Sequence, residues 1–357
     1  MATPALLGRH PLVLSGLVRR RVGVVRGRAP GLAVALAVAG VATVAGREVP
    51  LVGGPVFGIV LGVLVAAVLH PGERFRPGFA VAAKPVLQTS IVVLGATLSL
   101  RQVATVGSSS FPVMLGTLAV ALGGAWLLGR VLGVGRDTTL LVGVGTAICG
   151  ASAIAAAQSV LRAREPTVAY AIGTIFTFNV VAVLAYPPLG HLLGLDAHAF
   201  GLWAGTAIND TSSVVAAGYA YGGDAGPYSV VVKLTRSLMI IPIVTALAVV
   251  LARRRGRPDD APRGFRGLPW ARLVPLFLVG FVVASALTTG GVVPASWRPA
   301  LTVVGTFLIT TALAGIGLSM RVGDLRRAGV RPLLLGGCLW ALVGASSLGL
   351  QALSGTL

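Results

Sequence analysis

Charged residues are scarce in this chain. They make up only 11% of its 357 residues, while 55% are hydrophobic and the mean hydropathy is +0.90. A soluble domain carries about 25% charged residues, so the composition excludes one and predicts an all-α integral membrane protein. Lysine and arginine outnumber the acids by 29 to 10. The arginines nevertheless stand between apolar runs, where the positive-inside rule places them, so we expect no nucleic-acid partner.

Cysteine and histidine are also rare, and catalytic patterns are missing. Cys149 and Cys338 both fall within apolar segments, which argues against a disulfide framework and favours small core residues. The histidines stand in loops or at segment ends, and they are His10, His70, His191 and His198. No nucleophilic triad, phosphate-binding loop or HExxH spacing occurs. We therefore expect no enzyme, no metal site and no other cofactor.

What the chain does have is a succession of apolar segments. A helix needs about 20 residues to span a bilayer, and about 10–11 segments approach that length. They are 30–46, 51–69, 84–100, 111–133, 138–160, 168–188, 198–219, 226–252, 269–288, 299–320 and 332–355. We expect residues 30–357 to form one polytopic transmembrane domain, with a basic cytoplasmic loop at about 253–268.

The first 29 residues contain arginines and no acid. We interpret residues 1–29 as a basic cytoplasmic arm that is disordered or lies on the membrane surface. A signal peptide using the run Gly31–Gly46 is the alternative, but the long basic lead and the many later segments favour a first transmembrane helix. Four further arginine clusters then fall on the cytoplasmic side when crossings are counted from a cytoplasmic N-terminus. They begin at Arg74, Arg130, Arg253 and Arg321.

A polar motif interrupts two of the apolar segments. Gly205–Ala216 and Gly145–Ala156 lie 60 residues apart, and six of their twelve paired positions are identical. Asn, Asp, Thr and Ser prefer helix caps to helix interiors, so the run 209–213 predicts a helix break. In the first copy, Gly150 permits the same break without a steric cost.

The second half of each broken helix would present a free N-terminus, which attracts anions. Five residues next to the breaks are therefore candidates for anion binding, and they are Gly150, Ser152, Thr211, Ser212 and Ser213.

The two broken segments can be placed in the membrane in two ways. If 138–160 and 198–219 both cross fully, Arg162 and Arg164 lie outside. If both are re-entrant hairpins, these arginines stay inside, which fits the positive-inside bias better. The second arrangement also brings the two motifs to the midplane from opposite faces, as in an inverted repeat. We expect hairpins.

Only one acid, Asp210, lies deep within an apolar segment. An ionisable residue there marks a functional site by default, although a fixed ion pair or a protonated acid that locks two helices is the alternative. The deeply placed cations Lys233 and Arg236 are three residues apart and share one helix face. They can pair with Asp210, hold a substrate anion or snorkel to an interface.

These motifs resemble those of the YeiH-type sulfate exporter family of bacterial inner-membrane proteins. The resemblance rests on 145–153, 205–217, 233–236 and 305–308 with 317–319, and it covers about residues 30–355. It implies a multi-pass inner-membrane transporter with inverted repeats and broken helices. Asp210 matches the family's acidic position. Many members have histidine just before it, where this chain has Asn209, so the resemblance implies no histidine proton relay here.

Three functions follow from these observations. The first is a secondary transporter that exports a small anion such as sulfate or a sulfonate, coupled to protons or a cation through Asp210. In this hypothesis Lys233 and Arg236 supply the countercharge. The second is a sodium/proton antiporter that uses the pair Asn209–Asp210, and the third is a membrane scaffold or sensor. The lipid bilayer is the surrounding partner in each case, and assembly into a homo-oligomer stays open.

Overall fold

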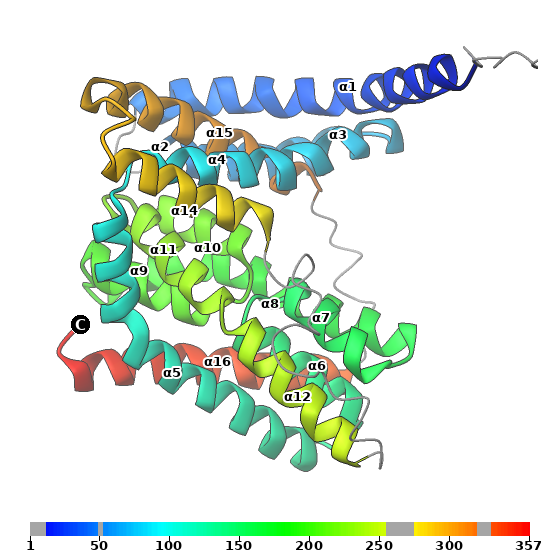
Figure 1. The fold of residues 1–357 in the computed structure, drawn as a ribbon, viewed down its shortest axis with the longest axis vertical. Coiled ribbons are helices and arrows are strands. Elements are labelled where there is room, and N and C mark those ends of the chain that lie inside the picture. The colour runs from blue at the N-terminus through cyan, green and yellow to red at the C-terminus, as the bar shows by residue number, and fades with distance from the viewer. Residues whose placement is uncertain (1–11, 49–52, 255–274, 320–329) are drawn as a thin grey trace, which may run out of the picture.

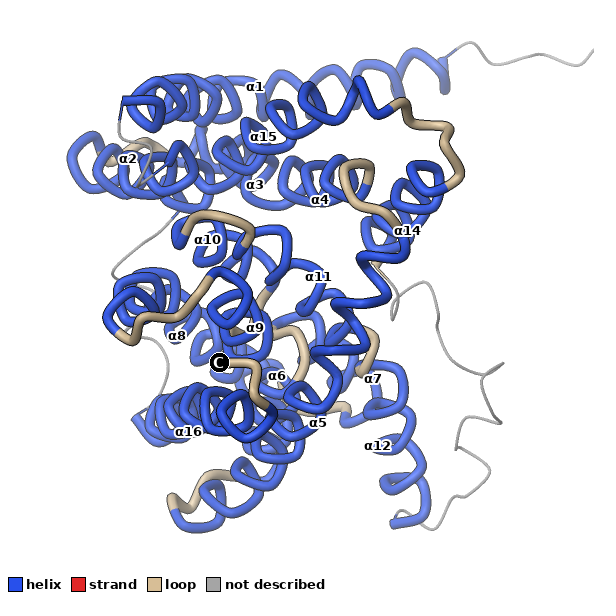
Figure 2. Tube along the Cα trace, turned by 90° about the vertical axis from the view of Figure 1, so that its left-hand side faces the viewer, coloured by secondary structure: helices blue, strands red, loops and turns tan. Residues whose placement is uncertain are grey.

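The computed structural model describes residues 12–48, 53–254, 275–319 and 330–357. Within these ranges every regular element is a helix and none is a strand, as Figure 2 shows. Seven helical stretches of the described chain are long and apolar enough to cross a membrane. These observations confirm the prediction of an all-α integral membrane protein. The predicted loop at 253–268 lies largely outside the described residues, as do residues 1–11.

The first helix begins earlier than the sequence predicts. Helix α1 (Leu12–Glu48) is continuous through Pro30, and its apolar part, Gly27–Glu48, is a candidate membrane span. Residues 12–29 are therefore helical rather than disordered, and their place on the cytoplasmic membrane surface stays a prediction. Leucine and arginine are good helix formers, and a helix that is already nucleated in the apolar run extends through them readily.

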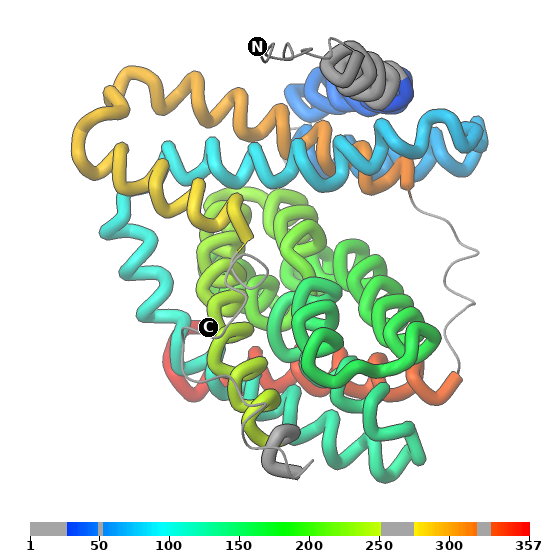
Figure 3. The backbone as a smooth tube through the Cα atoms, turned by 45° about the vertical axis from the view of Figure 1, so that its right-hand side comes forward, coloured from blue at the N-terminus to red at the C-terminus, as the bar shows by residue number. Residues whose placement is uncertain are grey.

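Two layers of helices make up the molecule (Figures 1 and 3). The first layer contains α1, the elements that pack against it, and further elements that pack against those. These elements are α2 (Gly53–Leu69), η1 (Glu73–Phe75), α3 (Arg76–Val81), the π-helix η2 (Ala82–Val86), α4 (Leu87–Gly95), α14 (Leu276–Thr289), η5 (Ala295–Trp297) and α15 (Arg298–Ser319). Glycine lets α2 and α15 approach closely, because a Cβ on Gly62 would lie 2.6 Å from the carbonyl oxygen of Ala314.

The second layer contains the two polar motifs. Its helices are α5 (Leu100–Val131), α6 (Arg136–Ala147), α7 (Ala151–Leu161), α8 (Glu165–Leu192), α9 (Ala197–Ala207), α10 (Thr211–Tyr221), α11 (Ala225–Ser237), α12 (Ile240–Arg254) and α16 (Val330–Ser354). Each apolar segment with a motif is split into two short helices, and the second halves α7 and α10 are offset by the 60 residues that separate the motifs. The predicted helix breaks are confirmed.

The second broken segment, α9–α10, is a hairpin. The ring of Phe200, near the start of α9, stacks on that of Tyr221 at the end of α10, with 3.8 Å between ring centroids. The Tyr221 hydroxyl also donates to the carbonyl of Leu195, just before α9. Both ends of the hairpin therefore lie together, beside His191 at the end of α8, whose ring stacks on Tyr221.

The first broken segment, α6–α7, is a hairpin that enters from the other end of the molecule. Helix α7 ends at Leu161, and α8 starts at Glu165 and runs from there to the base of the second hairpin. The start of α6 shares a cavity of about 630 Å³ with Val250, near the end of α12, and α7 also packs along α12. Both ends of α6–α7 thus lie together, as the distribution of Arg162 and Arg164 predicted. The hairpins enter from opposite ends, which is the expected inverted arrangement.

Candidate functional site

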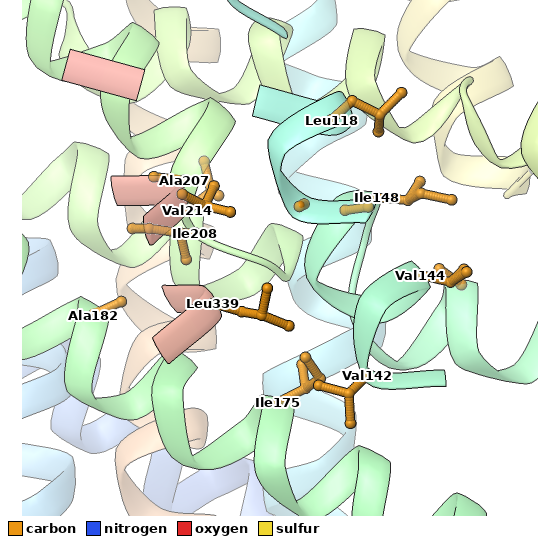
Figure 4. Packing of buried hydrophobic residues seen from close by; sticks show 14 of the residues in the cluster. Leu118, Val142, Val144, Ile148, Ile175, Ala182, Ala207, Ile208, Val214 and Leu339 are labelled. Atoms are coloured by element: carbon orange, nitrogen blue, oxygen red, sulfur yellow. The ribbon is translucent and has the colours of Figure 1, made fainter. Parts of the chain in front are cut away.

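The tips of the two hairpins touch each other inside the second layer. A Cβ placed on Gly150 would lie 3.3 Å from the Cβ of Asp210. Ile148 and Ile208, the cap residues that end α6 and α9, belong to one buried apolar cluster with Ile175 of α8 (Figure 4). Four helix ends therefore meet here, namely the C-termini of α6 and α9 and the N-termini of α7 and α10.

Lys233 of α11 bridges the two C-terminal ends. Its Nζ donates to the carbonyl of Ile148 at 2.9 Å and to that of Ile208 at 2.7 Å. The last carbonyls of a helix have no partner within the helix and carry the negative end of its dipole. The ammonium satisfies one such carbonyl from each hairpin, and its side chain is 0% exposed.

Arg236, one turn further along α11, binds the same two helix ends. Its Nε donates to the carbonyl of Ala147 at 2.7 Å, its Nη2 to that of Thr146 at 2.8 Å, and its Nη1 to that of Thr206. Four of the five carbonyls that the two cations bind form matched pairs across the 60-residue repeat, Ile148 with Ile208 and Thr146 with Thr206. The two cations thus use the internal symmetry of the hairpins to hold both tips.

The structure decides between the predicted roles of these cations. Both side chains are 0% exposed, so the snorkelling alternative is wrong. Among the described residues no ion pair joins Lys233 or Arg236 to Asp210. Their donors bind backbone carbonyls, so a contact with a substrate anion would need the N–H groups that these bonds leave free. A lysine ammonium has three N–H donors in all, and an arginine guanidinium has five.

Asp210 caps the N-terminus of α10. Its carboxylate accepts hydrogen bonds from the backbone N–H groups of Ser212 at 2.6 Å and Ser213 at 3.3 Å. It also accepts from the hydroxyls of the same two serines. An acid at this position satisfies orphan donors and complements the helix dipole. Asp210, Thr211, Ser212 and Ser213 are all half-buried, so the acid is neither sealed in the core nor freely solvated.

The N-terminus of α7 lacks such a cap. Gly150 occupies the cap position with φ 66° and ψ −128°, and no side chain caps the helix there. Ser152, in its first turn, is exposed. Of the two half-helix N-termini, one is already complemented by a carboxylate and the other is open to an external anion.

A buried amide on α8 completes the surroundings, and the sequence reasoning missed it. The side-chain oxygen of Asn179 accepts the backbone N–H of Asn209 at 3.3 Å, and both residues are 2% exposed. Among the described residues, Oδ1 of Asn209 and Nδ2 of Asn179 have no partner. An amide within the apolar segment 168–188 is the signal that could have indicated Asn179, since buried polar groups need partners.

The cysteines differ from the prediction in part. Cys149 lies at the tip of the first hairpin and is half-buried, whereas Cys338 on α16 is exposed, and both are free. The interpretation of Cys338 as a core residue is therefore wrong. An exposed side chain on a membrane-spanning helix faces lipid, where a small apolar residue costs little.

A separate cavity of about 830 Å³ lies between the two layers. Its walls come from α4 and α15 of the first layer and from α5, α9, α10 and α11 of the second, so relative movement of the layers would change its shape. The cavity is lined by the polar side chains of Thr97, Ser99, Arg101, Gln102, Thr105, Ser109, His198, Tyr219, Asp224, Tyr228, Thr302 and Thr306, together with apolar residues. None of the residues at the hairpin tips lines it.

The geometry at Gly150 predicts a large effect from a small substitution. Gly150→Ala should lower the free energy of unfolding by about 1–3 kcal/mol, because its backbone conformation is one that only glycine adopts readily. The added Cβ would also contact Asp210 and Ile175 at 3.3 Å. Thermal unfolding in detergent micelles measures the change.

Gly123→Ala is the matched control, because a Cβ at Gly123 in α5 meets nothing within 4 Å. It should leave stability unchanged or raise it slightly. Equal effects at Gly123 and Gly150 would contradict the strain argument.

These features define the class of the chain as a polytopic helical membrane protein in which the tips of two helical hairpins meet. The family model described as Conserved hypothetical protein 698 matches residues 30–336, and the chain belongs to that family. The relatives agree with the YeiH-type resemblance of the motifs over most of the chain. They also show the protein to be a multi-pass membrane protein of the UPF0324 group.

Three relatives illustrate the similarity. A UPF0324 membrane protein of Fusobacterium nucleatum subsp. nucleatum is 37% identical over 330 residues, which cover 87% of this chain and 93% of the relative. One of Streptococcus agalactiae serotype V is 37% identical over 340 residues, covering 92% of this chain and 98% of the relative. One of Streptococcus pyogenes serotype M6 is 39% identical over 331 residues, covering 90% and 96%.

Proposed function

We propose that the protein is a secondary transporter that exports a small anion of the sulfate or sulfonate type, with proton coupling through Asp210. The proposal assigns it no enzymatic reaction. The observation that carries it is the meeting of four half-helix ends with one acid and two fully buried cations. Half-helix ends near the bilayer midplane are the usual substrate and ion sites of transporters built from inverted repeats.

The charges at the hairpin tips favour an anionic substrate. Lys233 and Arg236 bring two positive charges against the single negative charge of Asp210, and the partial charges of the two helix C-termini and two N-termini offset one another. A buried excess of positive charge is costly unless a counter-charge is present. An anion at the uncapped N-terminus of α7, next to Ser152, would supply that charge.

Coupling follows from competition for hydrogen-bond donors. In the described conformation the Asp210 carboxylate takes two backbone N–H groups and the hydroxyls of Ser212 and Ser213. A protonated Asp210 accepts these bonds more weakly and releases the donors to an incoming anion. Proton binding and anion binding then favour each other, so the proton travels with the anion. If the anion and its proton together still carry a net negative charge, a membrane potential that is negative inside drives their export. The driving free energy is about 2.3 kcal/mol per charge for each 100 mV.

The orientation of the chain belongs to the same proposal. Arg162 and Arg164 lie at the base of the α6–α7 hairpin, and α1 starts among further arginines. By the positive-inside rule this end faces the cytoplasm of a bacterial inner membrane. The cavity between the layers contains His198 and Asp224 from the base of the other hairpin, so we assign it to the outer side of the anion's path.

Arg101 gives this path a testable element. It is an exposed cation in the wall of the cavity, where it can attract an anion without belonging to the hairpin tips. Arg101→Gln should raise the KM for the anion several-fold with little change in kcat, and the effect should weaken at high salt. Arg298→Gln, another exposed arginine that does not line the cavity, is the control. A fall in kcat with unchanged KM would contradict this role.

Flux in proteoliposomes tests the main proposal. We expect labelled sulfate, or a small sulfonate such as methanesulfonate, to cross vesicles that contain the protein faster than protein-free vesicles. An imposed pH gradient should accelerate the flux. Rates equal to those of protein-free vesicles for every anion tested would overturn the proposal.

A sodium/proton antiporter is the second candidate, and one observation favours it. The side-chain oxygen of Asn209, the residue before Asp210, is buried without a partner in the described structure. Amide and carboxylate oxygens are ligands that suit a hard cation. This alternative predicts sodium-driven proton movement that needs no anion, which a pH-sensitive dye inside the vesicles would detect.

A further inference from the structure

The position of the Lys233 ammonium has a consequence for ion coupling. Nζ lies within hydrogen-bond distance of two carbonyl oxygens that come from different hairpins, at 2.9 Å from Ile148 and 2.7 Å from Ile208. Both carbonyls belong to the residues that cap the first half of a broken helix. The side chain is 0% exposed, so the ammonium is a fixed part of the interior.

A carbonyl cluster of this kind is what a bound metal cation uses in other transporters. Unwound backbone carbonyls and half-helix C-termini coordinate the sodium ion where helices are broken, because the negative ends of the helix dipoles point there. In this chain the ammonium stands between the two carbonyls. The guanidinium of Arg236 takes three more, from Thr146, Ala147 and Thr206.

A lysine suits this position between two carbonyls better than an arginine would. The chain has 29 cationic side chains, and only Lys84 and Lys233 among them are lysines. Lysine carries a compact point charge with three donors, whereas the arginine fork is planar. A point charge suits two carbonyls that come from different hairpins, much as a small cation would.

The acid next to the tips offers little to a second cation in this conformation. Both carboxylate oxygens of Asp210 accept hydrogen bonds from Ser212 or Ser213. Two more positive charges, Lys233 and Arg236, would repel a sodium ion bound beside them.

We propose that Lys233 is a built-in cation that takes the place of a coupling sodium ion between the hairpin tips. The protein then binds no sodium at this position. The second part of the inference, that the proton is the coupling ion, rests on the proposed transport function. The first part concerns binding alone.

Thermal unfolding of the purified full-length protein tests the proposal without any measurement of transport. The probes are sodium chloride and choline chloride at equal ionic strength. The wild type should unfold at the same temperature in both salts. Lys233→Ala should unfold at a lower temperature in choline, and sodium should raise that temperature by at least about 2 °C, because the freed carbonyls now bind the ion.

Two controls and one rescue make the test decisive. Lys84→Ala removes the chain's other, exposed lysine and should show no sodium effect. Lys233→Arg retains a cation and should resemble the wild type in its indifference to sodium. Methylammonium, a free version of the lost group, should stabilise Lys233→Ala and not the wild type.

Two results would overturn the proposal. A sodium-specific stabilisation of the wild type would overturn the proposal, and this arm needs no variant to fold. A folded Lys233→Ala that responds to neither sodium nor methylammonium would also overturn it. If sodium behaves as proposed but no anion flux is found in proteoliposomes, the proposed function fails and the built-in cation stands.

Discussion

Replacing Arg236 by methionine should lower the free energy of unfolding by at least about 3 kcal/mol, because several buried hydrogen-bond acceptors would be left unsatisfied. Methionine keeps much of the side-chain volume but provides no donor. Three buried carbonyls, those of Thr146, Ala147 and Thr206, would lose their partner at once, and each unsatisfied acceptor costs about 1–3 kcal/mol. Thermal and chemical unfolding in detergent micelles, followed by tryptophan fluorescence, measure the loss.

Two comparisons separate this hydrogen-bonding role from the effect of charge alone. Arg236→Lys keeps the charge but replaces a planar fork by a point donor, so it should recover only part of the stability. Arg298→Met removes an exposed arginine and should change stability by no more than about 0.5 kcal/mol. If Arg236→Met is as mild as Arg298→Met, the two cations do not hold the hairpin tips together.

The helix breaks could be predicted from the sequence because the signal for them is local. Residues 209–213 are cap formers in a row, and Gly150 is a residue that tolerates φ 66°. The hairpin arrangement could also be predicted, because two arginines at 162 and 164 carry the information about which side of the membrane their loop occupies.

The partners of Lys233 and Arg236 could not be predicted in the same way. Every residue has a backbone carbonyl, so no letter of the sequence shows which carbonyls a buried cation will bind. The sequence offers Asp210 as a partner for these cations, because it is the one acid deep within an apolar segment. The structure instead pairs the acid with the helix N-terminus and the cations with the C-termini, which is the arrangement that helix dipoles favour.

The start of α1 could not be predicted from hydropathy. The change in hydropathy near residue 30 predicts where the apolar span begins, but helix formation does not stop at that change. Once the apolar run forms a helix, each added residue gains a backbone hydrogen bond at little cost, and the helix continues back to Leu12. Hydropathy indicates where a helix enters lipid, and it does not indicate where the helix begins.

Asp210→Asn should abolish the dependence of anion flux on the pH gradient while leaving the fold intact. Asparagine is as good an N-cap as aspartate, so α10 should still begin at Thr211, and stability should change by less than about 1 kcal/mol. The amide cannot take up a proton, and it accepts hydrogen bonds more weakly than a carboxylate does. An anion can then compete for the donors of Ser212 and Ser213 at every pH, and we expect tighter anion binding with uncoupled, passive flux.

Asp196→Asn is the matched control for this result. Asp196 caps α9 at the base of the same hairpin, where its side chain accepts the N–H of Ala199 at 2.7 Å. Asp196→Asn repeats the chemical change of Asp210→Asn at a cap far from the tips, so it should keep the response to the pH gradient. Asp210→Ala removes the cap altogether and should cost about 1–2 kcal/mol in addition. Anion flux in Asp210→Asn that still follows the pH gradient would show that the proton is carried elsewhere, and Asp210 would then be only the cap of α10.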